Sequence, residues 1–101
     1  MNTAPQKTWA EQSQDIFQLT STTFDEFLKE KDVFVAFYAP WCGHCSDMKP
    51  AFFATAKKLK EENFPTVLAA IDATQAKDIA KREGVTGYPT CKFSNFITRK
   101  H

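Results

Sequence analysis

Long apolar runs, a surplus of one charge and a dense set of cysteines are all missing from this chain of 101 residues. Without an apolar run that could span a bilayer, the sequence predicts no membrane contact. The formal net charge is +1, with acidic and basic residues mixed along the chain, which gives no electrostatic basis for binding nucleic acid. Three cysteines are too few for a small secreted protein stapled by disulfides.

Hydrophobic residues make up 43% of the chain and include ten phenylalanines, which is enough for a core without a disulfide framework. Residues 1–14 are polar and have no usable period, so we predict a linker in which Trp9 docks locally. Residues 15–101 then form the one domain. The linker has no apolar stretch of the signal-peptide kind, which fits a cytosolic protein or a domain cut from a longer protein of the secretory pathway.

Apolar periodicity along the domain alternates between the patterns of strands and helices. Strands are expected at residues 15–19, 33–39, 67–71 and from 88 onward, and helices at 23–31, 42–62 and 76–83. Thr23 and Glu26 form a capping-box pattern at the start of one helix, and Gly84 is placed to end another. Strands that alternate with helices favour an α/β sandwich whose sheet has a mostly parallel centre.

Two cysteines stand at the start of the longest predicted helix, in the run Tyr38-Ala39-Pro40-Trp41-Cys42-Gly43-His44-Cys45. Disulfide exchange needs a thiolate, and unpaired backbone N–H groups at a helix start favour the anion of Cys42. Cys45 lies one turn further on the same face, where it can close a disulfide or attack a mixed disulfide. His44, in the Gly43-His44 insert, is predicted to stabilise the thiolate, which makes the oxidised pair a stronger oxidant.

Zinc sites and haem attachment also use two cysteines at this spacing. A structural zinc site needs four ligands, and Cys91, His44 and His101 do not form a second paired motif. Haem attachment requires His after the second cysteine, where this chain has Ser46. The sequence therefore predicts neither a metal nor another cofactor, since the disulfide itself carries the electrons.

The cysteine-containing run resembles the active-site segment of the protein disulfide isomerase family. The segments that carry the resemblance are residues 37–45, Met48-Lys49-Pro50, Ile71-Asp72-Ala73-Thr74 and Gly84-Val85-Thr86-Gly87-Tyr88-Pro89-Thr90. They occur in the family's order over residues 15–93. The resemblance implies a thioredoxin-like, three-layer α/β sandwich with a mixed sheet, in a protein of the endoplasmic reticulum lumen.

By this resemblance Cys42 attacks, Cys45 resolves and Pro89 is a cis-proline that faces the pair. A cis bond is physically plausible at Tyr88-Pro89 because only X–Pro bonds adopt it at low cost, although an ordinary strand-entry proline is the alternative. The backbone near Tyr88 would pair with an extended substrate, and Trp41 would either offer apolar surface to unfolded clients or pack structurally. The implied partners are unfolded or disulfide-containing proteins, and glutathione or another redox partner.

Three positions depart from the family's pattern. Ala36 stands where many members have a buried Glu, and Ala70 stands where a Lys commonly accompanies it. Because both are missing together, no buried charge is left unpaired. The proton relay that the family's Glu provides during attack by the second cysteine is also missing, so we expect slower resolving chemistry at Cys45. Cys91 stands where the family usually has an aliphatic residue, and it is expected to be a buried small hydrophobe rather than a redox group.

The end of the sequence departs further. The family continues past its fourth strand into a fifth strand and a last helix, which residues 96–101 do not resemble, so we expect an incomplete domain whose fourth strand is an exposed edge. The leading hypothesis is an enzyme, a thiol–disulfide oxidoreductase that oxidises or isomerises disulfides in protein substrates. The alternative is a client-binding or adaptor module with weak redox activity, which uses Trp41, Tyr88 and the exposed strand.

Overall fold

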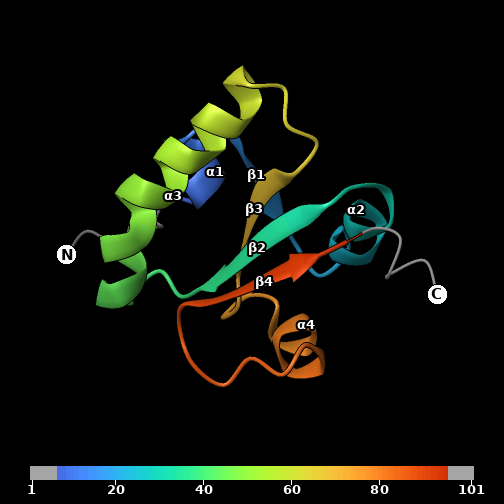
Figure 1. The fold of residues 1–101 in the computed structure, drawn as a ribbon. Coiled ribbons are helices and arrows are strands. Elements are labelled where there is room, and N and C mark those ends of the chain that lie inside the picture. Colours follow the sequence, from blue (N-terminus) through green and yellow to red (C-terminus); the bar gives the residue numbers. More distant parts are fainter. Residues whose placement is uncertain (1–6, 96–101) are drawn as a thin grey trace.

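The computed structural model describes residues 7–95 as a sheet with helices on both faces (Figure 1). Along the chain the elements are α1 (Trp9–Gln12), β1 (Ile16–Leu19), α2 (Phe24–Glu30), β2 (Val33–Tyr38), α3 (Gly43–Glu61), β3 (Val67–Asp72), α4 (Lys77–Arg82) and β4 (Thr90–Ser94). The expected alternation of strands and helices is confirmed. The expectation of an incomplete C-terminus rests on residues 96–101, which lie outside the described residues.

The four strands form one mixed sheet in the order β1-β3-β2-β4. β3 pairs in parallel with both β1 and β2, whereas β4 runs antiparallel to β2. α1 and α3 pack on one face of the sheet, and α2 and α4 pack on the other (Figure 1). The predicted three-layer, thioredoxin-like sandwich with a mostly parallel centre is therefore confirmed.

β2 lies inside the sheet and is buried on both faces, as its unbroken apolar sequence predicts. Val35 and Phe37 enter the core beneath α2 and α4, and Ala36 and Tyr38 enter the core beneath α1 and α3. This alternation follows from the two-residue period of a strand. β2 ends at Tyr38, and the cysteine-containing run follows directly and leads into α3.

The prediction of a linker over residues 1–14 misses α1. The Thr8 hydroxyl accepts a hydrogen bond from the Glu11 N–H at 3.2 Å, and the Thr8 N–H donates to the Glu11 carboxylate at 2.7 Å, which closes a capping box. Trp9 is only 1% exposed and stacks on Tyr38 with 4.6 Å between ring centroids. α1 is not evident from the sequence because four residues are too few to show helical periodicity. The predicted local docking of Trp9 is confirmed.

The ends of the two shorter helices opposite α3 test two local predictions. The capping box predicted at Thr23 is wrong, because its hydroxyl accepts a hydrogen bond from the Thr20 N–H at 2.9 Å instead of capping α2. The end of α4 is as predicted. Gly84 has a φ of 75°, and the N–H of Val85 donates to the carbonyl of Ala80 at 2.9 Å, the long bond of a Schellman motif.

Candidate active site

Cys42 caps the start of α3, directly after the turn that leaves β2. Its backbone N–H donates to the Ala39 carbonyl at 3.1 Å, which closes that turn. Its Sγ accepts a hydrogen bond from the Cys45 N–H at 3.3 Å, in the way that a Ser or Asp oxygen caps a helix. The nucleophile predicted from sequence is thus held against the unpaired N–H groups of α3.

The pKa of Cys42 is lowered from its ordinary value. The largest cause is a hydrogen bond from the Cys45 thiol, and the backbone N–H groups of Cys45 and His44 add to it. Partial desolvation and the negative charge of Asp47 act in the opposite direction. Because each of these N–H and S–H donors favours the anion, the site stabilises the thiolate form of Cys42.

Cys45 has the opposite character, although it lies one helical turn away. It is 1% exposed, against 8% for Cys42, and packs in the core that contains Ala36 and Ala70. Burial is the main reason why its pKa is raised to about 11, and its hydrogen bond to Cys42 adds to this effect. The pair therefore consists of one thiol whose thiolate is stabilised and one thiol that stays protonated at neutral pH, and both are reduced in this structure.

His44 and Gly43, the insert between the cysteines, face solvent. The part of His44 that lowers the pKa of Cys42 is its backbone N–H. Within residues 7–95 no hydrogen bond joins the imidazole to either sulfur, so the electronic role predicted for that ring stays a prediction. A Cβ at Gly43 would meet no atom within 4 Å, which leaves the front of the helix start open to a substrate.

The loop before β4 completes the site from the other side. The Tyr88-Pro89 peptide bond is cis, as the resemblance implied. The Tyr88 carbonyl accepts from the Cys42 thiol, with 3.6 Å between Sγ and oxygen, although the two residues are 46 positions apart. Trp41 is 71% exposed and touches the Tyr88 ring edge-on at 5.8 Å between centroids. The structure therefore brings together Trp41, Cys42, Cys45, Tyr88 and Pro89, all predicted from sequence.

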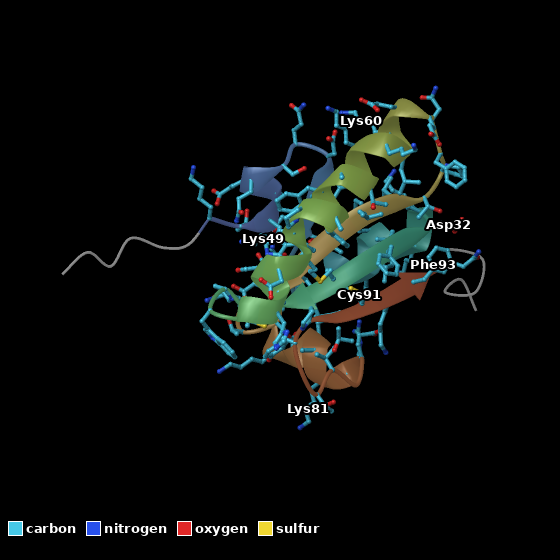
Figure 2. All side chains as sticks on the ribbon, turned by 60° about the vertical axis from the view of Figure 1, so that its left-hand side comes forward. Asp32, Lys49, Lys60, Lys81, Cys91 and Phe93 are labelled. Atoms are coloured by element: carbon cyan, nitrogen blue, oxygen red, sulfur yellow. The ribbon has the colours of Figure 1, made fainter. Side chains whose placement is uncertain are left out.

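Beneath the helix start, three small residues form a row across the sheet. Ala36 pairs with Ala70 on one side and with Cys91 on the other. The expectation that Cys91 is buried is wrong, because it is exposed. β4 is an edge of the described sheet, and its α3-side residues Cys91 and Phe93 are both exposed (Figure 2).

The described residues form neither a metal-binding cluster nor a membrane-spanning helix. Within residues 7–95 no three His, Cys, Asp or Glu side chains gather closely enough to hold a metal ion. His101, considered as a ligand above, lies outside the described residues. None of the helices in the described part of the chain is long and apolar enough to cross a membrane.

Comparison with known proteins gives a consistent result. The sequence profile of the family described as thioredoxin matches residues 15–97. Protein disulfide-isomerase of Oryctolagus cuniculus is 45% identical over 87 residues, which are 84% of this chain and 17% of that protein. Protein disulfide-isomerase A5 of Bos taurus is 43% identical over 91 residues, which are 88% of this chain and 18% of that protein. The chain thus spans less than a fifth of these curated relatives.

Solved structures agree with the sequence matches. The first thioredoxin domain of mouse protein disulfide-isomerase A4 aligns with a TM-score of 0.73 and 40% identity, covering 80% of this chain and 59% of that one. Mitochondrial thioredoxin 3 of Saccharomyces cerevisiae, in its oxidised form, aligns with a TM-score of 0.67 and 30% identity, covering 81% of this chain and 76% of that one.

Proposed function

Because this chain belongs to the thioredoxin family and is strongly similar to its protein disulfide isomerases, we propose that it oxidises or isomerises disulfides in protein substrates. The observation that carries the proposal is that two thiols one turn apart have pKa values shifted in opposite directions. Cys42 has a lowered pKa at the open start of α3, and Cys45 has a pKa raised to about 11 behind it. Such a pair suits disulfide exchange, because one thiol attacks as a thiolate while the other is held back to resolve the mixed disulfide.

In the oxidising direction the pair begins as the Cys42–Cys45 disulfide. A client thiolate attacks the Cys42 sulfur, a client–Cys42 disulfide forms, and Cys45 leaves and takes up a proton. A second client thiolate then attacks the client sulfur of that mixed disulfide and expels Cys42 as a thiolate. The client loses two electrons and the pair gains them. Glutathione disulfide, or another disulfide of the same class, restores the oxidised pair.

Isomerisation uses the same atoms without net electron transfer. The Cys42 thiolate attacks a client disulfide, and the released client thiolate attacks elsewhere in the client until Cys42 is expelled. Cys45 acts when this exchange stalls, by attacking Cys42 and freeing the client in reduced form. The lowered pKa of Cys42 makes its thiolate a better leaving group than an ordinary thiolate, which favours its release in both reactions.

Clients are expected to lie across Trp41 and the loop that contains the cis peptide bond. The exposed indole of Trp41 offers apolar contact, and the backbone near Tyr88 is the place for a client in extended conformation. By similarity to its relatives, we place the protein in the endoplasmic reticulum lumen.

The direct test is the redox equilibrium of Cys42 and Cys45 in glutathione buffers. The fraction of reduced protein is measured by mass spectrometry after alkylation of the free thiols. We expect a reversible Cys42–Cys45 disulfide. Turnover of a dithiol client should fall below detection in Cys42→Ser, while Cys91→Ser, the matched control, should retain it. Unchanged activity in a folded Cys42→Ser variant would refute the proposal.

The 71% exposed indole of Trp41 also favours a second candidate, a client-binding or adaptor module with weak redox activity. Binding of an unfolded peptide to the Cys42→Ser/Cys45→Ser variant, together with negligible turnover in the intact chain, would favour this candidate over the enzyme. Loss of that binding in Trp41→Ala would locate the contact.

A further inference from the structure

A cavity of about 470 Å³ lies beside the active site, between α4 and the loop that leads to the cis peptide bond. Its apolar wall includes Ala73, Ala80 and Val85, and Tyr88 also lines it. The Tyr88 carbonyl lies 3.6 Å from the Cys42 sulfur. Tyr88 thus connects the cavity with Cys42, and a client joined to Cys42 in a mixed disulfide would have its neighbouring residues within reach of the cavity.

Two lysines on α4, Lys77 and Lys81, line this cavity. They are four residues apart, so they lie on the same side of the helix, and Figure 2 shows Lys81 projecting from α4 on the side of the sheet opposite α3. Both are exposed, and within residues 7–95 neither ammonium group has an ion-pair partner. The two positive charges are therefore available to a ligand.

The other charged groups of α4 and its end do not neutralise the cavity. Asp78 points elsewhere and accepts a hydrogen bond from the Ser21 hydroxyl at 2.7 Å. Arg82 pairs with Asp25 on α2 and with Glu83. No acidic side chain is found among the described residues that line the cavity. The cavity thus combines an apolar wall with two positive charges among its lining residues.

We propose that this cavity is a client subsite that binds an acidic side chain next to the client's reacting cysteine. The methylene groups of a Glu or Asp would contact the apolar wall, and its carboxylate would pair with Lys77 and Lys81. The inference rests on the proposed function, because the subsite is useful only when a client sulfur reaches Cys42. It assigns a sequence preference, acidic over neutral over basic, to the same site.

The size of the preference follows from the exposure of the lysines. Each exposed ion pair is weak, so two of them favour an acidic client over a neutral one by about fivefold in kcat/KM. The preference should vanish in about 1 M salt, where the Debye length is about 3 Å. A basic client should react more slowly than the neutral one at low salt.

The test uses three dithiol peptides that differ only beside one cysteine, where they carry two Glu, two Gln or two Lys. Their oxidation rates are measured with the full chain, with Lys77→Met/Lys81→Met and with Lys57→Met, a control that removes an exposed lysine of α3 outside the cavity. We expect the double variant to lose the preference for the Glu peptide and to keep the rate of the Gln peptide. The control should behave like the unmodified chain.

Three outcomes would overturn the inference. The first is equal oxidation rates for the Glu and Gln peptides, and the second is a preference for the Glu peptide that survives in the double variant. The third is a double variant that changes only the reaction with glutathione. That result would assign the cavity to the carboxylates of glutathione. Failure of the proposed function looks different, because then none of the peptides is oxidised and no reversible disulfide forms.

Discussion

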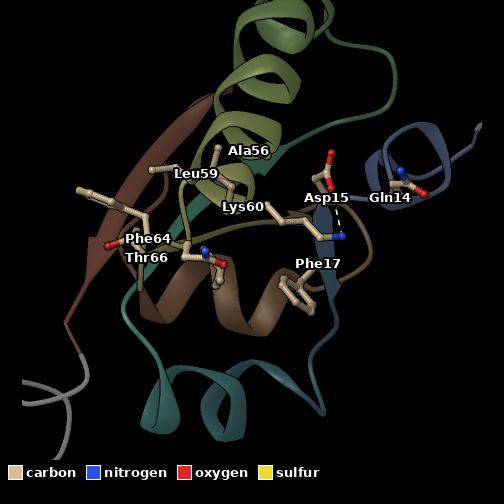
Figure 3. Close-up of a pocket in the computed structure, with 11 residues that line it drawn as sticks. Gln14, Asp15, Phe17, Ala56, Leu59, Lys60, Phe64 and Thr66 are labelled. Atoms are coloured by element: carbon tan, nitrogen blue, oxygen red, sulfur yellow. Dashed lines mark ion pairs between the residues drawn. The ribbon is translucent and has the colours of Figure 1, made fainter.

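The two ends of α3 each lie near an exposed aromatic ring and differ in chemistry. At its start, Cys42 caps the helix beside the exposed ring of Trp41. At its end, the Phe64 N–H donates to the Leu59 carbonyl at 2.9 Å, and the ring of Phe64 is exposed. Leu59 and Phe64 also line a cavity of about 320 Å³ (Figure 3). Each end of α3 thus has an exposed aromatic ring close by.

The chemistry at the far end is that of a helix C-terminus. Lys60 reaches across the cavity to Asp15 at the start of β1, with 3.4 Å between nitrogen and oxygen (Figure 3). Lys58, also in the last turn, pairs with Glu62. Cations suit the unpaired carbonyls of a helix end, just as anions suit the unpaired N–H groups of a helix start. The backbone of α3 therefore favours a thiolate at its start and not at its end.

The largest expected effect is on thiol alkylation by iodoacetamide as a function of pH. Cys42 should react with a midpoint below the ordinary thiol pKa of 9.0, and Cys45 with a midpoint of about 11. A gap of more than two pH units means more than about a hundredfold difference in thiolate at neutral pH. Mass spectrometry of peptides alkylated at each pH measures it.

A matched thiol at the other end of the helix sharpens this result. In a Cys42→Ser/Glu62→Cys variant, the new cysteine sits at the C-cap of α3 and should titrate at or above 9.0. A midpoint as low as that of Cys42 would show that the helix end has no influence on the thiol.

An intermediate effect is expected beneath the start of α3. Ala36→Glu places a carboxylate in the core that contains Cys45, where it can accept the proton that Cys45 must lose before it attacks. Release of a client–Cys42 mixed disulfide should become several-fold faster, at a cost of about 3–5 kcal/mol in stability, because Ala36 is fully buried. Stopped-flow kinetics and thermal melts measure the two changes.

The control for that variant is Ala36→Gln, which adds similar volume but no base. Adding Ala70→Lys should recover part of the stability, because Ala36 and Ala70 are direct register partners. Equal release rates for the Glu and Gln variants would contradict a general-base role.

The smallest effect is expected at the far end of α3. Lys60→Met removes the ion pair with Asp15, but Lys60 is largely exposed, so stability should change by at most about 1 kcal/mol. The alkylation profile of Cys42 should not change. A shifted midpoint would mean that the two ends of α3 are coupled.

Local signals accounted for much of the fold. The apolar run of β2, the helical spacing of α3 and the glycine at the end of α4 all predicted what the structure shows, because each depends on neighbours along the chain. The prediction at Thr23 was wrong because two local hydrogen bonds compete for its hydroxyl. The hydroxyl accepts from the Thr20 N–H in the preceding turn instead of from an N–H of α2. The prediction that Cys91 is buried was wrong because the exposure of a residue on an edge strand depends on which elements pack over that strand.

The spacing of Cys42 and Cys45 and their place at a helix start can be read from the chain alone, because both follow from residues within one turn. The difference between the two thiols arises from the packed fold. Cys45 has its high pKa because α3 packs it against the sheet, and Cys42 meets the Tyr88 carbonyl because the sheet brings together segments 46 residues apart. Burial and long-range contact are products of packing, and no local pattern contains them.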